Sequence, residues 1–464
     1  MLKPANMHEL LNSEYFCAYP FLHLSTVPAG FLRPCCFYQE MIKNDDGTTS
    51  NISTNTIEQI WNNNNFRNIR KSMLNNEKLT GCGQCQREDA HGGDSMRKRS
   101  LREWGNRSEF GLMVEDALEN DGKLKSDIKF LELKPGNLCN LKCRMCNQFD
   151  SSSYAAELQT IGAKFSGIEN TGSRLFEDHT FEFDFNLSKM ADWKNNTAVW
   201  DSFERLIPSL ENLSFAGGEP TLIEEVYQAL KKCVDTGHSR HITVYFASNF
   251  TQKMEKFLAL SKHFRRFDFI ASIDGTEEVQ EYIRFPSKWS VVSDNFKQVA
   301  EFCRFQKNVN ALVNMTVNVY NISGVTRLLS WIEQDSLKES FKEDPYNLNI
   351  LVYPQYLAIA NLPDTMKESV VAELEAFGKR SWAAKRTEHI AGRFVQLTNM
   401  VKASKIENHL KTLKEFWVYN AILDQHRKQS FQHALPELHT HVVDCLHGHG
   451  IDPEGLLKFY KVIT

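Results

Sequence analysis

The sequence lacks any run of about 18 consecutive apolar residues, the length that a membrane-spanning helix needs. It also lacks the uninterrupted apolar core of a secretory signal, because Lys3, Glu9 and Glu14 fall among the apolar positions of its first 19 residues. We therefore expect a cytoplasmic protein that does not bind membranes.

Neither sign of charge prevails in the 464 residues. The chain has 54 Lys and Arg residues against 58 Asp and Glu residues, and a formal net charge of -4 gives no overall field that would recruit nucleic acid. We expect no nucleic-acid partner. Hydrophobic residues make up 42% of the chain, enough for a sizeable core, and the length predicts one large domain with additions.

Cysteine, in contrast, is plentiful, with 11 residues. Eight of them lie in close-spaced groups or near a glycine turn. That distribution is typical of metal sites in a reducing compartment rather than of disulfides.

The tightest group is the triplet Cys139, Cys143 and Cys146, which spans eight residues and has no further His or Cys after it at zinc-site spacing. Three thiolates are one fewer than the four that close an iron-sulfur cluster or a tetrahedral zinc site. The centre therefore keeps an open position at which chemistry can occur. A zinc knuckle or a chance cluster of cysteines is the alternative.

The triplet follows the hydrophobic run 128–133 and resembles the signature of the radical S-adenosylmethionine (SAM) superfamily. In that family three Cys hold a 4Fe-4S cluster and SAM chelates the fourth iron through its amino and carboxylate groups. The family usually has an aromatic residue before the third Cys, where this chain has Met145. The resemblance implies that Cys139, Cys143 and Cys146 bind a 4Fe-4S cluster, that SAM is bound there, and that a reductant such as ferredoxin or flavodoxin supplies electrons.

A second group lies in the first hundred residues, where Cys17 and Cys35 flank Gly30 and are followed by Cys82 and Cys85. Apolar residues at helical spacing over 57–73 predict one or two helices between the two Cys pairs. Four Cys can close a metal site. A structural zinc ribbon with these four ligands stays open as an alternative.

This order of Cys, Gly, Cys, helix and Cys-x2-Cys resembles the auxiliary-cluster twitch domain, a shortened SPASM domain carried by many radical SAM enzymes. The resemblance implies that Cys17, Cys35, Cys82 and Cys85 bind one auxiliary 4Fe-4S cluster. Cys36 is left out of this set, because it adjoins Cys35 and would point away from the cluster. The position also departs from the family, in which the module usually follows the barrel instead of preceding it.

From residue 128 onward, predicted strands alternate with predicted helices. The strands are expected at 128–133, 210–215, 242–247, 267–273, 312–317 and 348–353. Such alternation predicts an α/β fold with a parallel sheet, here a partial (β/α)6 TIM-like barrel with a Cys-rich module before it and a helical region after it.

The second of these strands ends in Gly217-Gly218-Glu219-Pro220, which is similar to the Gly-Gly-Glu-Pro motif of radical SAM enzymes. The resemblance implies that the two glycines let the backbone approach the methionine part of SAM, while Glu219 accepts a hydrogen bond from its ammonium group. Pro220 fixes the turn.

Four further residues are predicted to bind SAM. Ser272 and Asp274 are two positions apart and so share one face of a strand. By resemblance they contact the ribose or carboxylate of SAM, with Arg284 as a carboxylate partner and Asn249 at the end of the preceding strand. For Asn249 and Arg284, ordinary loop hydrogen bonding is an equal alternative. No catalytic side chain is assigned.

The predicted domains follow from these patterns. They are a twitch/SPASM-like module at 1–100, a solvated linker at 101–127, the radical SAM barrel at 128–360 with an insertion at 150–209, and a helical C-terminal region at 361–464. The insertion is expected to contain one opening helix near 153–161 and then irregular structure.

The hypothesis for function is a radical SAM enzyme that cleaves SAM reductively and takes a hydrogen atom from a substrate. By resemblance to twitch and SPASM enzymes, we expect a peptide or protein substrate and an auxiliary cluster that transfers electrons or positions the substrate. Two alternatives are an enzyme that acts on a sugar or nucleoside, and a non-catalytic cluster or zinc protein that docks a partner.

Overall fold

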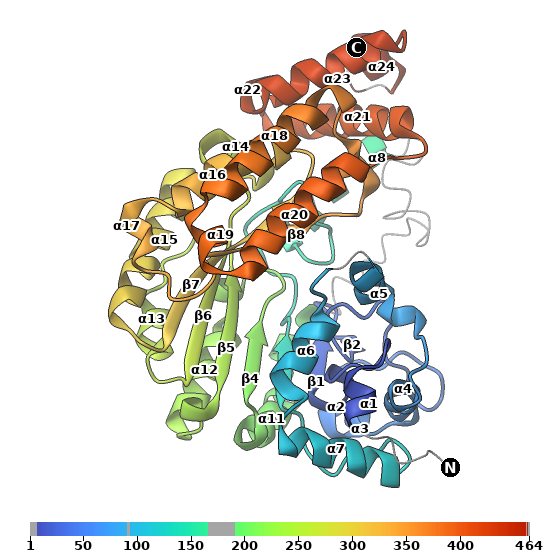
Figure 1. The fold of residues 1–464 in the computed structure, drawn as a ribbon, viewed down its shortest axis with the longest axis vertical. Helices are drawn as coiled ribbons and strands as arrows, with labels where there is room; N and C mark the ends of the chain where they lie inside the picture. The colour runs from blue at the N-terminus through green and yellow to red at the C-terminus, as the bar shows by residue number, and fades with distance from the viewer. Residues whose placement is uncertain (1–6, 91–92, 166–190, 461, 463–464) are drawn as a thin grey trace. The chain divides into compact units, whose positions relative to one another are not determined.

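The computed structural model describes residues 7–90, 93–165, 191–460 and 462 (Figure 1). The chain forms two compact units. The first comprises residues 1–137, 186–247 and 259–267, and the second comprises 138–185, 248–258 and 268–464.

The first unit has five strands in the order β2-β1-β3-β4-β5. The hairpin partners β1 (His23–Thr26) and β2 (Leu32–Arg33) are antiparallel, whereas β1, β3 (Phe130–Leu133), β4 (Asn212–Phe215) and β5 (Thr243–Ser248) are parallel neighbours.

The register of these parallel strands separates two kinds of row. Leu24, Leu131, Leu213 and Val244 are aligned and all are fully buried. The next row holds the polar residues Ser25, Glu132, Ser214 and Tyr245. Since side chains alternate across a sheet, one face of this unit is an apolar core and the other is polar.

Helices surround these strands. They are α1 (Met7–Leu11), α2 (Tyr19–Leu22), α3 (Ile57–Trp61), α4 (Asn64–Leu74), α5 (Gly83–Ala90), α6 (Met96–Trp104), α7 (Ser108–Glu119), α11 (Thr197–Leu206) and α12 (Glu224–Asp235), with 3-10 turns η1 (Thr80–Cys82), η2 (Ala191–Asn195), η3 (Ile207–Ser209), η4 (Pro220–Leu222) and η5 (Ser239–His241). Where one or two helices were predicted between the Cys pairs, two form, α3 and α4, and they are separate because Asn63 caps α4 by accepting from the Phe66 amide.

Two expectations for this unit are wrong. Residues 101–127 are not a solvated linker, because they include α7, whose Phe110, Met113 and Val114 are buried. The later part of the insertion is not all irregular, because α11 forms there and buries Phe203 and Leu206. The part of the insertion at 166–190 lies outside the described residues.

The second unit contains β7 (Val309–Val317) and β8 (Tyr346–Ile350), which are parallel neighbours, and most of β6 (Arg266–Ser272). Its helices are α8 (Ser152–Phe165), α14 (Glu277–Ile283), α15 (Trp289–Phe305), α16 (Val325–Ile332), α17 (Asp335–Lys338), α18 (Asp364–Arg380), α19 (Trp382–Arg386), α20 (Glu388–Ala403), α21 (His409–Arg427), α22 (Phe431–Ala434), α23 (Pro436–Gly448) and α24 (Pro453–Phe459), with 3-10 turns η6 (Ile322–Gly324), η7 (Gln355–Leu357) and η8 (Ile359–Asn361). Helix α13 (Glu255–Ser261) has residues in both units.

The predicted mixed α/β fold is confirmed. All six predicted strands form, as β3 to β8, and the C-terminal region is helical from α18 to α24, drawn in orange and red in Figure 1. The hairpin β1–β2 adds two strands that the sequence pattern did not predict. In the part of the chain that the structure describes, no helix is both long and apolar enough to cross a membrane.

Candidate metal centres

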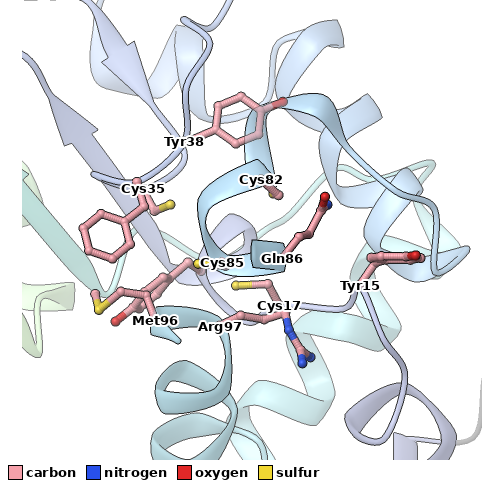
Figure 2. A pocket seen from close by; sticks show the side chains of 11 residues that line it. Tyr15, Cys17, Cys35, Tyr38, Cys82, Cys85, Gln86, Met96 and Arg97 are labelled. Atoms are coloured by element: carbon pink, nitrogen blue, oxygen red, sulfur yellow. The ribbon is translucent and has the colours of Figure 1, made fainter. Parts of the chain in front are cut away.

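The four N-terminal cysteines predicted to bind a cluster line one cavity in the first unit. Figure 2 shows Cys17, Cys35, Cys82 and Cys85 around a common space, although they are spread over 69 positions of the sequence. The remaining wall is mostly aromatic or apolar and consists of Tyr15, Tyr19, Phe37, Tyr38, Gln86, Met96 and Arg97. All four cysteines are free thiols.

Local structure brings the first pair together. Cys17 precedes α2 and β1, and Cys35 follows β2, so the antiparallel hairpin returns the chain to the same end. Gly30 makes the turn with φ +85°, and a Cβ at that position would lie 2.8 Å from Oδ1 of Asn51. A glycine is therefore required there.

The second pair sits on a turn that runs into a helix. Cys82 ends η1 and Cys85 lies in α5. Gly81 packs flat against Tyr38, since a Cβ on Gly81 would come within 2.3 Å of the tyrosine ring. This close approach brings Tyr38 and Cys82 to the same wall.

Burial dominates the electrostatics of the cavity. It raises the pKa of Cys17 and Cys35, that of Cys82 to about 12 and that of Cys85 to about 11. The charge of a Cys17 thiolate further raises the pKa of the other three, which places the four sulfurs in one electrostatic group. Such thiols bind as thiolates only to a positively charged centre, so the donor set fits an iron-sulfur cluster.

Arg97 is the one guanidinium among the residues lining this cavity. Its Nε donates to Asp89 at 2.8 Å, and its charge lowers the pKa of Cys17. Arg97 falls within the predicted module at 1–100, but the sequence pattern gave it no role. Cys36, which was left out of the predicted ligand set, is not among the residues that line the cavity.

Cys139, Cys143 and Cys146, the predicted three-cysteine site, lie in the second unit, in the loop between β3 and α8. Cys143 is buried, and Cys139 and Cys146 are partly exposed. Burial raises the pKa of Cys146, and negative charge on Asp150, Cys143 and Cys139 raises it further. The three thiols therefore share one environment.

The loop is tied to the start of α8. The Ser153 hydroxyl donates to the Cys139 carbonyl oxygen at 2.6 Å, the Cys139 amide donates to the Ser152 hydroxyl at 3.2 Å, and Ser151 donates to the Leu141 carbonyl oxygen at 2.6 Å. Three successive serines thus fix the first half of the loop.

Arg284 and Asp274 meet beside this loop. Arg284 Nε donates to Asp274 Oδ2 at 2.6 Å, and its Nη1 lies 3.9 Å from the Cys143 sulfur. Asp274 is fully buried and also accepts from the Thr316 amide at 2.7 Å. Its oxygens therefore hold Arg284 in place, and Arg284 brings a positive charge to a predicted cluster ligand.

Asn249 also reaches the loop, through Asn140. The side-chain Nδ2 of Asn249 donates to Asn140 Oδ1 at 3.0 Å, and Asn140 Nδ2 donates to the Thr251 hydroxyl at 2.8 Å. Ser272 is half-buried at the end of β6. The predicted residues Asn249, Asp274 and Arg284 thus gather around the cysteine loop, by direct contact or through one neighbour.

The glycine-rich turn belongs to the first unit. Gly217 has φ +74°, and a Cβ there would lie 2.6 Å from Cβ of Lys134. Glu219 is buried and accepts from the amide and hydroxyl of Thr221 at 3.1 and 2.6 Å, capping the 3-10 turn that begins with Pro220. Gly218 is also in the positive-φ region.

Among the described residues, no three or more His, Cys, Asp or Glu side chains converge on a single metal-ion position. The structure thus presents two sets of cysteines, one around a cavity and one on a loop. Their roles as metal ligands stay predictions.

Comparison with known families bears on the first set. Residues 17–86 match the SPASM family, described as an iron-sulfur cluster-binding domain. The N-terminal module is SPASM-like. The matched range contains Cys17, Cys35, Cys82 and Cys85, so the module predicted from their spacing is confirmed, and iron-sulfur binding is favoured over a zinc ribbon.

Solved structures of SuiB from Streptococcus suis are also similar to the chain. SuiB bound to precursor peptide SuiA matches at 10% identity and TM-score 0.34, SuiB bound to S-adenosylmethionine at 10% and 0.34, and a further SuiB structure at 12% and 0.33. Each match covers 65% of this chain and 60%, 58% and 59% of the SuiB chains, respectively. Among curated proteins, none matches the sequence.

The SPASM-like module extends beyond the matched range. Arg97 and Met96 of α6 line its cavity, and the Ser100 hydroxyl lies 3.5 Å from the Cys17 sulfur. Helix α6 therefore contributes to the wall of the cavity, beyond the last cysteine of the set.

Proposed function

We propose that the protein is a radical SAM enzyme with an N-terminal auxiliary iron-sulfur cluster. The observation that carries this proposal is the contrast between a complete set of four cysteines in a SPASM-like module and an incomplete set of three on a separate loop. A complete set holds a cluster without help, and an incomplete set leaves one iron for a small molecule.

The residues beside the three cysteines suit SAM as that small molecule. Arg284 would offer its guanidinium to the SAM carboxylate while Asp274 keeps it oriented. By its resemblance to the Gly-Gly-Glu-Pro motif, the turn at Gly217 and Gly218, both at positive φ, is proposed to bind the methionine part of SAM through its backbone.

A reduced cluster with bound SAM supplies one kind of chemistry, the reductive cleavage of SAM to methionine and a 5'-deoxyadenosyl radical that takes a hydrogen atom from a substrate. The contribution of the chain is to position both molecules and to exclude water. The finer proposal of a peptide or protein substrate rests on the resemblance of the Cys pattern to twitch and SPASM enzymes. The auxiliary cluster would accept an electron from the substrate radical, or it would help to position the substrate.

The test is the iron, sulfide and zinc content of protein purified and reconstituted without oxygen, for the wild type and for the Cys139→Ala/Cys143→Ala/Cys146→Ala variant. We expect about eight irons to fall to about four in the variant, and only the wild type to form 5'-deoxyadenosine from SAM with a strong reductant.

Other outcomes would revise the proposal in defined ways. About four irons falling to near zero, with about one zinc retained, would keep the SAM enzyme and remove the auxiliary cluster. Unchanged iron in the variant, with no SAM cleavage by the wild type, would contradict the proposal and favour a non-catalytic cluster protein.

A further inference from the structure

Arg144 lies between two of the predicted cluster ligands, Cys143 and Cys146, and is buried. A buried guanidinium is costly unless each polar atom finds a partner. The partners of Arg144 therefore indicate what this position is built to do.

Two of the four side-chain partners come from one helix, α21. Arg144 Nη1 donates to Asn420 Oδ1 at 2.9 Å, and Nη2 pairs with the Asp424 carboxylate. The remaining side-chain bonds go to the Tyr282 carbonyl oxygen at 3.0 Å and to Gln429 Oε1 at 3.0 Å. The guanidinium also stacks on the Tyr282 ring, 3.6 Å from its centroid.

The backbone of Arg144 is held as firmly as its side chain. Its amide donates to the Ile283 carbonyl oxygen at 2.8 Å, and its carbonyl oxygen accepts from the Tyr419 hydroxyl at 2.6 Å. Tyr419 belongs to α21 as well. The middle of the cysteine loop is thus fixed at its amide, its carbonyl and its side chain.

The α21 partners are themselves fixed. Asn420 Oδ1 also accepts from the hydroxyls of Tyr282 and Tyr320 at 3.0 and 2.9 Å, and Asp424 accepts from the Phe431 amide at 2.6 Å. Asn420 and Asp424 are four residues apart and lie on one face of the helix.

The same helix grips α8, which follows the loop. Arg427 of α21 and Glu157 of α8 are both buried and form a bidentate pair, with Nε to Oε1 at 3.0 Å and Nη2 to Oε2 at 2.5 Å. The hydroxyls of Tyr154 and Tyr419 lie 3.1 Å apart. Helix α21 therefore contacts the middle of the cysteine loop, through Arg144, and also helix α8, which follows that loop.

We propose that α21 is a positioning element of the three-cysteine site and that it acts through Arg144. The C-terminal helical region then completes the site instead of serving as an accessory domain. Hydrogen bonds to the groups around metal ligands orient those ligands and set the affinity and redox potential of the metal. The inference rests on the proposed function only in naming the bound group as an iron-sulfur cluster with SAM at its open iron.

The test uses the full-length reconstituted protein and two variants, Arg144→Lys, which keeps the charge but loses the planar fork, and Asp424→Asn, which keeps the shape but loses the charge. The readouts are the electron paramagnetic resonance (EPR) spectrum of the reduced protein with and without SAM, and the rate at which a chelator removes iron. The change on adding SAM reports on the three-cysteine cluster alone.

We expect the SAM-dependent EPR change to be altered or lost in both variants. We also expect the chelator to remove about four irons about tenfold faster than from the wild type, since loss of an outer-shell partner typically weakens metal binding by about 10- to 100-fold. Should Arg144→Lys fail to fold, Asp424→Asn decides the question, since it changes the least volume.

The matched control is Arg70→Met in the first unit. Arg70 is equally buried, donates to the carbonyl oxygens of Pro20, Trp61 and Gly122, and stacks 4.3 Å from the Trp61 ring. The Arg70→Met variant is expected to have lower thermal stability but an unaltered SAM-dependent EPR change.

If the Arg144 and Asp424 variants lose stability as the control does, yet keep the wild-type EPR change and release rate, the inference is overturned and Arg144 is a folding residue only. If the wild type itself shows no SAM-dependent EPR change, the proposed function fails first, so the two failures are distinguishable.

Discussion

The two cysteine sets differ in how they are built. Around the cavity of the first unit, the thiols come from three separate segments and face mostly aromatic and apolar side chains. On the loop of the second unit, they come from eight consecutive residues and have as neighbours Arg284 and the pair that buried Arg144 forms with half-buried Asp424. An apolar wall around a complete ligand set suits a cluster that stores or passes electrons. Charged groups around an incomplete set suit the binding of a charged molecule.

The most direct test of this comparison is to remove predicted metal ligands from each set in turn. We expect Cys82→Ala/Cys85→Ala to lower the free energy of unfolding by more than about 4 kcal/mol, because a small module depends on its metal for folding. Cys143→Ala should cost less, since Arg144 and the serines of α8 still hold its loop.

Denaturant unfolding and iron content measured on both variants check this. Equal losses of stability would mean that the loop depends on its cluster as much as the module does, and that the polar network adds little.

The next effect concerns the charged surroundings of the loop. Asp274→Asn is expected to destabilise the protein by about 3–5 kcal/mol, because it breaks a buried ion pair and leaves the Arg284 charge uncompensated. Urea unfolding measures the loss.

The matched control is Asp364→Asn, which removes the ion pair between the exposed Asp364 carboxylate and Lys367 at 2.7 Å and should cost less than about 1 kcal/mol. A similar cost for both variants would show that the Asp274–Arg284 pair is no more important than a surface contact.

A pH effect of intermediate size is expected in the first unit, where His23 is fully buried between the rings of Tyr19 and Phe130. Burial lowers the pKa of His23 from 6.5 to about 4, although Glu132 at 3.7 Å opposes the shift. The unfolded chain therefore binds a proton between these two values and the folded chain does not, so stability falls as the pH drops from 6.5 toward 4.

Between pH 7 and pH 5 the loss attributable to His23 should be about 2 kcal/mol, and His23→Phe, which keeps a ring in the stack, should remove it. Unfolding curves at both pH values compare the variant with the wild type. A variant that keeps the full pH dependence would refute this assignment.

An effect of similar or smaller size is expected at the glycine-rich turn. Gly217→Ala forces an alanine into the left-handed backbone conformation and places its Cβ against Lys134. We expect it to lower the free energy of unfolding by about 1–3 kcal/mol and to weaken SAM binding. Gly47→Ala provides the control, because it has φ +86° but no atom within 4 Å of its Cβ, and should cost about 1 kcal/mol with no change in SAM binding.

Thermal unfolding and equilibrium binding of SAM distinguish these two variants. Unchanged SAM affinity in Gly217→Ala would separate the turn from the cofactor site.

Local pattern was enough to predict much of this protein. The strands β3 to β8 and the helices α3 and α4 follow from side-chain periodicity, which acts over a few residues. The triplet of the cysteine loop and the turn at Gly217 are likewise contiguous, so their residues were identifiable from spacing alone.

Other features depended on contacts between distant segments. Helix α7 was missed because no side chain caps its N-terminus and its burial depends on the rest of the first unit. Helix α11 does have an N-cap, Asn196, which accepts from the Ala198 amide, so its start could have been identified from the sequence. Helix α21 is buried on several sides and therefore lacks the one-sided apolar stripe that reveals a surface helix.

The sequence by itself determined which cysteines group together, the order of strands and helices, and the glycine turn, because these depend on neighbours along the chain. Only the tertiary structure decided that Cys17, Cys35, Cys82 and Cys85 share a cavity with Arg97, that Asp274 is committed to Arg284, and that α21 holds Arg144. Those arrangements join residues up to 280 positions apart, and nothing local to either partner encodes such a contact.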